Sequence, residues 1–148
     1  MSTSVVLLLS AHLAATAAMT GLIWFVQIVH YPLFEAIGPD RFVAYELAHQ
    51  RRTSFVVGPP MAVEGVTALV LLVAAPSGIG PALPLTGLGL LAVIHASTVF
   101  LQIPAHAALA RSHDPDSIHR LVRTNWIRTI GWSARSGVAV AMLIEAAT

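Results

Sequence analysis

The sequence predicts an all-α protein, a four-transmembrane-helix bundle whose helices run up and down through a lipid bilayer. Apolar residues make up 56% of the 148 residues and charged residues only 10%, whereas a soluble domain carries about a quarter charged residues. The mean hydropathy is +0.77. Six of the eight basic residues, all of them arginine, lie in two of the three connections between four apolar segments. The length predicts a single domain over residues 1–148.

The first span is expected over residues 4–29, a length that crosses the roughly 30 Å hydrocarbon layer. Pro32 disfavours helical geometry at the residue before it and so ends the span. No basic residue precedes this run, which is too long for a signal peptide, so we expect a retained helix. The inner loop that follows, residues 30–53, is expected to hold a short amphipathic helix from an N-cap at Asp40 to about Arg52.

The second span is expected over residues 54–75. Pro59 and Pro60 lie inside it, and they either kink the helix or mark its start, because proline fits a first helical turn. The connection to the third span, residues 76–84, carries no charge. An uncharged connection suits the outer side of a membrane.

The third span is expected over residues 82–104, with Pro104 as its end. A second inner loop then covers residues 105–123. The fourth span, residues 124–146, belongs to a longer helix that begins near Asp116. At 1.5 Å per residue this helix exceeds the thickness of the bilayer, so its inner end projects from the membrane.

The arginines also predict the orientation of the chain. Positive charge stays on the cytoplasmic side of inserted helices, so both arginine-bearing loops are expected in the cytoplasm of a bacterium and both termini outside its inner membrane. The bilayer is the expected partner. A net charge of +1 without a basic surface stripe argues against nucleic acid, and the absence of cysteine excludes disulfides and thiolate metal sites. A homo-oligomer is left open.

Polar residues inside the expected spans recur at helical spacing. His95, Gln102 and His106 are seven and four residues apart, which places them on one stripe of a helix. Ionisable groups in a bilayer are costly and usually face the interior of a bundle, where they often have a function. We therefore expect a polar cavity on the inner side, lined from several helices by His30, Glu46, His49, Glu64, His95 and His106.

Imidazoles and carboxylates are typical ligands of iron, copper and zinc, and four-helix bundles hold such ions with inward-facing side chains. All six of these residues are therefore candidate metal ligands. His30 and His106 could instead hold a haem between them. Glu64, Arg128 and Arg135 are candidate catalytic groups, because an arginine holds a carboxylate or phenolate through its fixed fork of donors. The expected substrate is a lipophilic or aromatic small molecule.

Each candidate also has a purely structural interpretation. Glu46 and His49, three residues apart on a loop helix, are more often a solvated pair. Glu64 and Arg135 are equally well explained as a buried ion pair that fixes helix packing. Arg128 can snorkel to the membrane interface. The histidines can be ordinary packing or interfacial residues: His30, His95 and His106.

Three blocks of the sequence resemble a family of small bacterial four-helix membrane proteins that has no assigned function. They are Gln27-x-x-His-Tyr-Pro-Leu-Phe34, Arg51-Arg-Thr-Ser-x-x-x-Gly-Pro-Pro-Met-x-x-Glu-Gly65 and Arg123-Thr-Asn-Trp-Ile-Arg-Thr-x-x-Trp-x-x-Arg135. The likeness covers nearly the whole chain. The run Asn125-Trp-Ile-Arg-Thr129 is also similar to the anthrone-oxygenase-like membrane proteins. That similarity implies that a four-span bundle of this size can be associated with oxidation of an aromatic substrate, and it assigns no catalytic residue.

Three classes of function follow from these observations. The first is a membrane-embedded oxidoreductase, dependent on a metal or haem, that acts on a lipophilic or aromatic small molecule. The second is a structural or accessory subunit in which Glu64 and Arg135 only fix packing. The third is a proton-linked carrier of a small solute, with Glu64 and His95 as its relay. The gathering of histidine and glutamate from different helices favours the first class.

Overall fold

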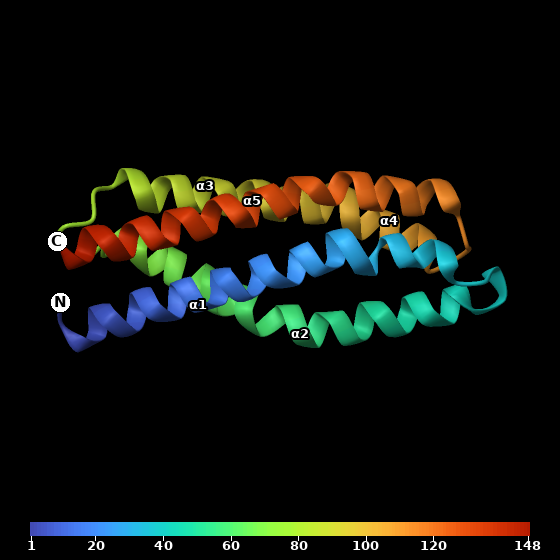
Figure 1. Ribbon diagram of the computed structural model, residues 1–148, viewed down its shortest axis with the longest axis horizontal. Coiled ribbons are helices and arrows are strands. Elements are labelled where there is room, and N and C mark those ends of the chain that lie inside the picture. Colours follow the sequence, from blue (N-terminus) through green and yellow to red (C-terminus); the bar gives the residue numbers. More distant parts are fainter.

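All regular structure in the computed structural model, which describes residues 1–148, is helical, as the sequence predicted. Figure 1 shows long helices packed side by side, with the two termini at one end of the molecule. In chain order the elements are α1 (Thr3–Phe25), the π turn η1 (Val26–His30), the 3-10 helix η2 (Pro32–Ala36), α2 (Pro39–Val73), α3 (Ala82–Ser97), the π turn η3 (Thr98–Gln102), α4 (Ile103–Leu109) and α5 (Pro115–Ala147).

Three helical stretches are long and apolar enough to cross a membrane: Thr3–Ala36, Pro39–Val73 and Ala82–Leu109. Large apolar side chains cover much of the outer surface, as Phe55 and Phe100 illustrate with 77% and 72% exposure. Soluble monomers rarely expose apolar surface on this scale, and contact with lipid explains it. These features indicate a membrane protein.

Helix α5 is the least apolar of the long helices and is not among these three stretches. It packs against α1, α3 and α4. Asn125, Thr129, Trp132 and Arg135 are all buried on it. These buried polar side chains lower the apolar content of α5, while its charged residues nearer the ends, such as Arg120, Arg123 and Glu145, are exposed.

Helix α2 is continuous over Pro39–Val73, so the short separate helix predicted before the second span does not exist. Pro59 and Pro60, which lack the N–H groups that continue a helix, were expected either to kink the second span or to mark its start. The helix bends there and does not end, and Figure 1 shows α2 changing direction near its middle. As a result, one helix carries both Glu46 and Glu64.

The long helices α2 and α5 start in different ways. The N-cap of α2 is Gly38, and Asp40, the predicted cap, lies in the first turn. Helix α5 begins after Asp114, whose carboxylate accepts hydrogen bonds from the hydroxyl of Ser117 and from its backbone N–H, the latter at 3.2 Å. These hydrogen bonds stabilise the ionised carboxylate and hold the pKa of Asp114 below its ordinary value.

Helices α1 and α3 each end in a π turn two residues before a proline. In η1 the N–H of Tyr31 donates to the carbonyl of Val26, five residues earlier, at 3.0 Å, and η3 has the same pattern. The wider turn gives room to the rings of Pro32 and Pro104, each of which would otherwise meet the carbonyl four residues before it. The sequence predicted that the helix would end at Pro104, but helical structure continues past Pro104 to Leu109. Such turns are frequent at functional sites.

Helices α3 and α5 approach each other closely at Gly131. A Cβ added there would lie 2.7 Å from Cγ1 of Ile94, a fully buried residue of α3. We expect Gly131→Ala to lower the free energy of unfolding by about 1–3 kcal/mol, because the core must shift to admit the methyl group. Gly137→Ala, on the same helix with no atom within 4 Å of the added Cβ, should keep or raise stability. Equal melting temperatures in detergent would contradict the close approach.

Candidate metal centre

Four titratable side chains meet toward the end of the bundle that lies opposite the termini. They come from three elements: His30 from η1, Glu46 and His49 from α2, and His106 from α4. We call these four residues the histidine–glutamate cluster. Glu46 is 0% exposed and His49 is 9% exposed, so they are not the solvated pair that their spacing favoured. The face of α2 that carries both residues points toward the interior of the bundle.

Glu46 is held at one carboxylate oxygen and unpartnered at the other. Its Oε1 lies 2.6 Å from Nδ1 of His106 and accepts a hydrogen bond from Nε2 of Gln50 at 2.9 Å. Its Oε2 is buried and has no hydrogen-bond partner. A buried acceptor without a partner costs free energy, and a bound cation would satisfy it.

One ligand atom from each of Glu46, His49 and His106 lies within 4.8 Å of the other two. Two atoms bound to one ion at about 2.1 Å lie at most about 4.2 Å apart, so small side-chain rotations bring the three into binding range. Two imidazoles and one carboxylate are the donor set of many catalytic zinc sites and of non-haem iron sites, both of which keep open coordination positions. The donor set therefore fits a transition-metal ion.

His30 lies beside this donor set. Its Nε2 is 2.9 Å from Nδ1 of His49, and the same nitrogen of His49 lies 3.1 Å from the hydroxyl of Thr53. Groups that hydrogen-bond a metal-binding imidazole fix the orientation of its ring. The geometry thus gives His30 a positioning role toward His49.

The arrangement does not favour a haem between His30 and His106. Both ring nitrogens of His106 are engaged, Nδ1 with Glu46 at 2.6 Å and Nε2 with the hydroxyl of Tyr31 at 2.9 Å. His30 is in direct contact with a neighbouring imidazole. A haem between the two histidines would have to break all of these contacts, whereas an ion shared by Glu46 and His106 would replace only the hydrogen bond between them.

A cavity of about 270 Å³ opens beside the cluster, between α2 and the stretch formed by η3 and α4. His49 and His106 reach its wall, together with Tyr31 and Arg128. The guanidinium of Arg128 lies 5.4 Å from the centre of the Trp132 ring, and its Nε is buried. Arg128 therefore contributes to the wall of the cavity and packs against Trp132.

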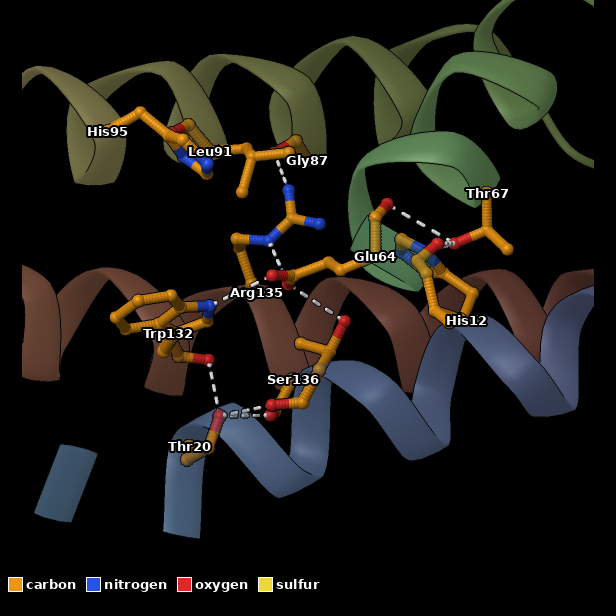
Figure 2. A network of polar contacts seen from close by, with 12 residues as sticks. His12, Thr20, Glu64, Thr67, Gly87, Leu91, His95, Trp132, Arg135 and Ser136 are labelled. Atoms are coloured by element: carbon orange, nitrogen blue, oxygen red, sulfur yellow. Dashed lines mark hydrogen bonds and ion pairs between the residues drawn. The ribbon is translucent and has the colours of Figure 1, made fainter. Parts of the chain in front are cut away.

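Glu64 and Arg135 form a separate buried network, which Figure 2 shows. Nε of Arg135 donates to Oε1 of Glu64 at 2.8 Å, and its NH1 donates to the carbonyl of Gly87. The hydroxyl of Thr16 donates to the same Oε1 and the indole N–H of Trp132 donates to Oε2, each at 3.0 Å. The protein itself satisfies both oxygens of Glu64, which suits the packing ion pair suggested by the sequence. The structure does not bring Glu64 into the cluster.

His95 lies apart from the cluster. Its Nδ1 is 2.9 Å from the carbonyl oxygen of Leu91 on its own helix, and Figure 2 shows no contact between His95 and Glu64. The relay on which the carrier hypothesis depends has no hydrogen bond in this structure. Helical spacing grouped His95 with His106, but η3 lies between them. A π turn has more residues per turn than an α-helix, and so it rotates the stripe.

The sequence reasoning missed Gln50. Its Nε2 donates to Glu46 and also to the carbonyl of His106, the latter at 3.2 Å, so it joins α2 to α4 at the cluster. The available signal was its spacing, since a residue four positions after Glu46 lies on the same helix face.

Comparison of the chain with protein-family models, with curated proteins and with solved structures found no match. The histidine–glutamate cluster and its cavity are therefore the features of this molecule that point to a function.

Proposed function

We propose that this protein is a metal-dependent oxidoreductase of a bacterial inner membrane that acts on a lipophilic or aromatic small molecule. One observation carries the proposal. Ligand atoms of Glu46, His49 and His106 gather beside a cavity, and the buried carboxylate among them has an oxygen that no protein donor satisfies.

The proposed topology has four spans, with α5 as the fourth. Burial of Asn125, Thr129 and Arg135 supports this, because in the middle of α5 lipid would meet mainly apolar residues. The first turn of α2, which carries Arg41, and the connection between α4 and α5, which carries Arg111, lie at the end of the bundle opposite the termini. The positive-inside rule then favours the cytoplasm for that end and the outside for both termini.

In this proposal some residues of the cluster bind the metal and others hold the metal ligands in position. A redox-active ion such as iron or copper would supply one-electron transfer when bound. Glu46 and the two nearest imidazoles would hold it, while Gln50 and His30 would keep Glu46 and His49 in position. Arg128 would hold an oxygen of the substrate at the cavity wall, and the apolar side chains around it would exclude water.

Protein purified in detergent from cells supplied with iron, copper and zinc is expected to carry about one transition-metal ion per chain, because three ligands approach binding range without a major rearrangement. Elemental analysis measures this. The double substitution His49→Ala with His106→Ala should remove the metal. His95→Ala and His119→Ala should retain it, because both residues lie outside the cluster.

Oxidation is tested on the same samples. Metal-loaded protein should consume dioxygen when mixed with a lipophilic phenol, and the doubly substituted protein should not. Folded protein that contains no transition metal after growth in metal-replete medium would contradict the proposal.

A structural or accessory role is the second candidate function, and the Glu64–Arg135 network favours it. The hydrogen bonds of this network join α1, α2, α3 and α5. Packing alone explains the network, because every oxygen of Glu64 already has a donor. The network and the cluster occupy different parts of the bundle, so separate substitutions test the two roles.

A further inference from the structure

Arg128 is the only permanently charged side chain on the wall of the cavity. The ion pairs of the structure involve other residues, so no carboxylate lies within 4 Å of its guanidinium. Its buried Nε donates to no acceptor. A buried cation without an anion is strongly unfavourable. The Arg128 side chain is only partly exposed, no carboxylate pairs with it, and the cavity beside it has room for a negatively charged partner.

The size and walls of the cavity limit what this partner can be. A cavity of about 150 Å³ holds benzene, so about 270 Å³ has room for one substituted ring. The imidazoles of His49 and His106 are 5.3 Å apart between centroids and inclined by 30°, and the Tyr31 ring meets that of His106 edge-on at 5.5 Å. Val57 and Ile103 add apolar wall. Flat rings pack favourably against such aromatic walls.

We propose that the cavity binds a single-ring aromatic molecule whose anionic oxygen, a carboxylate or a phenolate, pairs with the guanidinium of Arg128. The fixed fork of donors of an arginine matches a carboxylate through two hydrogen bonds and a phenolate through one or two. The ring then lies beside His49 and His106. The inference rests on the proposed function in that it names the substrate class of the same site.

Binding is tested with matched charged and neutral probes on metal-stripped protein in nanodiscs. The probes are 4-butylbenzoate with its methyl ester, and 4-nitrophenol, which is largely ionised at mildly alkaline pH, with its methyl ether. Equilibrium dialysis, corrected with empty nanodiscs, gives each Kd. The benzoate is expected to bind roughly 10- to 100-fold more tightly than its ester, as for a hydrogen bond to a charged group. Tighter binding of the nitrophenolate than of its methyl ether at mildly alkaline pH would show that the cavity also holds a phenolate.

Substitutions then assign the preference to Arg128. Arg128→Gln should abolish the preference for the acid, and Arg128→Lys should keep part of it, because the charge remains and the fork is lost. Arg123→Gln removes an exposed charge from the same helix and should change nothing. Ala107→Leu, which fills the cavity, should weaken binding of acid and ester alike while Arg128 is intact.

The outcomes separate this inference from the proposed function. Equal binding of benzoate and ester to the unmodified protein, or a preference that survives Arg128→Gln, overturns the inference. If the Arg128→Gln protein does not fold, the Ala107→Leu result and the acid–ester comparison still decide. A preference for the acid in protein that never acquires metal supports the inference and counts against the metal-dependent function. Metal binding without a preference for the acid supports the metal-dependent function and counts against the inference.

Discussion

Replacing Arg135 by methionine is expected to lower the free energy of unfolding by about 3–5 kcal/mol, the range for breaking a buried ion pair by removal of one partner. Methionine leaves the carboxylate of Glu64, which is 0% exposed, without its cation. The donors that remain, from Thr16 and Trp132, are neutral and do not balance the charge. Reversible unfolding in mixed micelles measures the loss, and Arg123→Met, an exposed charge on the same helix, should show little of it.

The double variant Glu64→Gln with Arg135→Met decides whether the two residues act as a pair. Each single substitution leaves one uncompensated buried charge, whereas the double substitution leaves none. The double variant is therefore expected to lose less stability than the sum of the two single losses. Strictly additive losses would mean that the 2.8 Å contact contributes nothing of its own, and the structural role of the network would then fail.

The all-helical class could be predicted from the sequence because it depends on averages over many residues. The low share of charged residues and the long apolar runs predict membrane helices whatever the details of packing. The helix ends could not be predicted in the same way. Pro59 and Pro104 both read as interruptions, yet a bend carries α2 past the first, and η3 carries helical structure past the second. Local proline chemistry alone does not distinguish a stop from an accommodated kink.

The sequence predicted which types of residue meet at the site, but it did not predict which particular residues take part. Residue type correctly indicated that histidine and glutamate would meet, as the contact of Glu46 with His106 shows. Spacing on an ideal helix also grouped His95 with His106, and η3 rotates the two away from each other. Glu46 was given little weight because a loop helix was expected to be solvated. Its burial depends on η1 and α4 covering one face of α2, a tertiary contact with no local signal in the sequence.

Replacing Glu46 by glutamine is expected to weaken binding of Fe²⁺ or Zn²⁺ by more than about 100-fold, which is the upper end of the loss for groups that only orient a metal ligand. The change is nearly isosteric. Glutamine can still accept hydrogen bonds at Oε1, and Oε2 has no hydrogen bond to lose. The metal-free protein should therefore unfold at nearly the same temperature as the unmodified protein. Competition with a chromophoric chelator measures the affinity.

Melting with and without metal distinguishes a ligand from a packing residue. A metal at about 100 times its Kd stabilises the folded state by about 2.7 kcal/mol, so the melting temperature of the unmodified protein should rise on addition of metal, and that of Glu46→Gln should not. Glu35→Gln is the matched control, because Glu35 pairs with His119 at 3.0 Å on the surface, and it should respond to metal as the unmodified protein does. An equal rise for Glu46→Gln would show that the ion binds elsewhere. A large loss of stability in the metal-free variant would show instead that Glu46 serves the packing of α2 against α4.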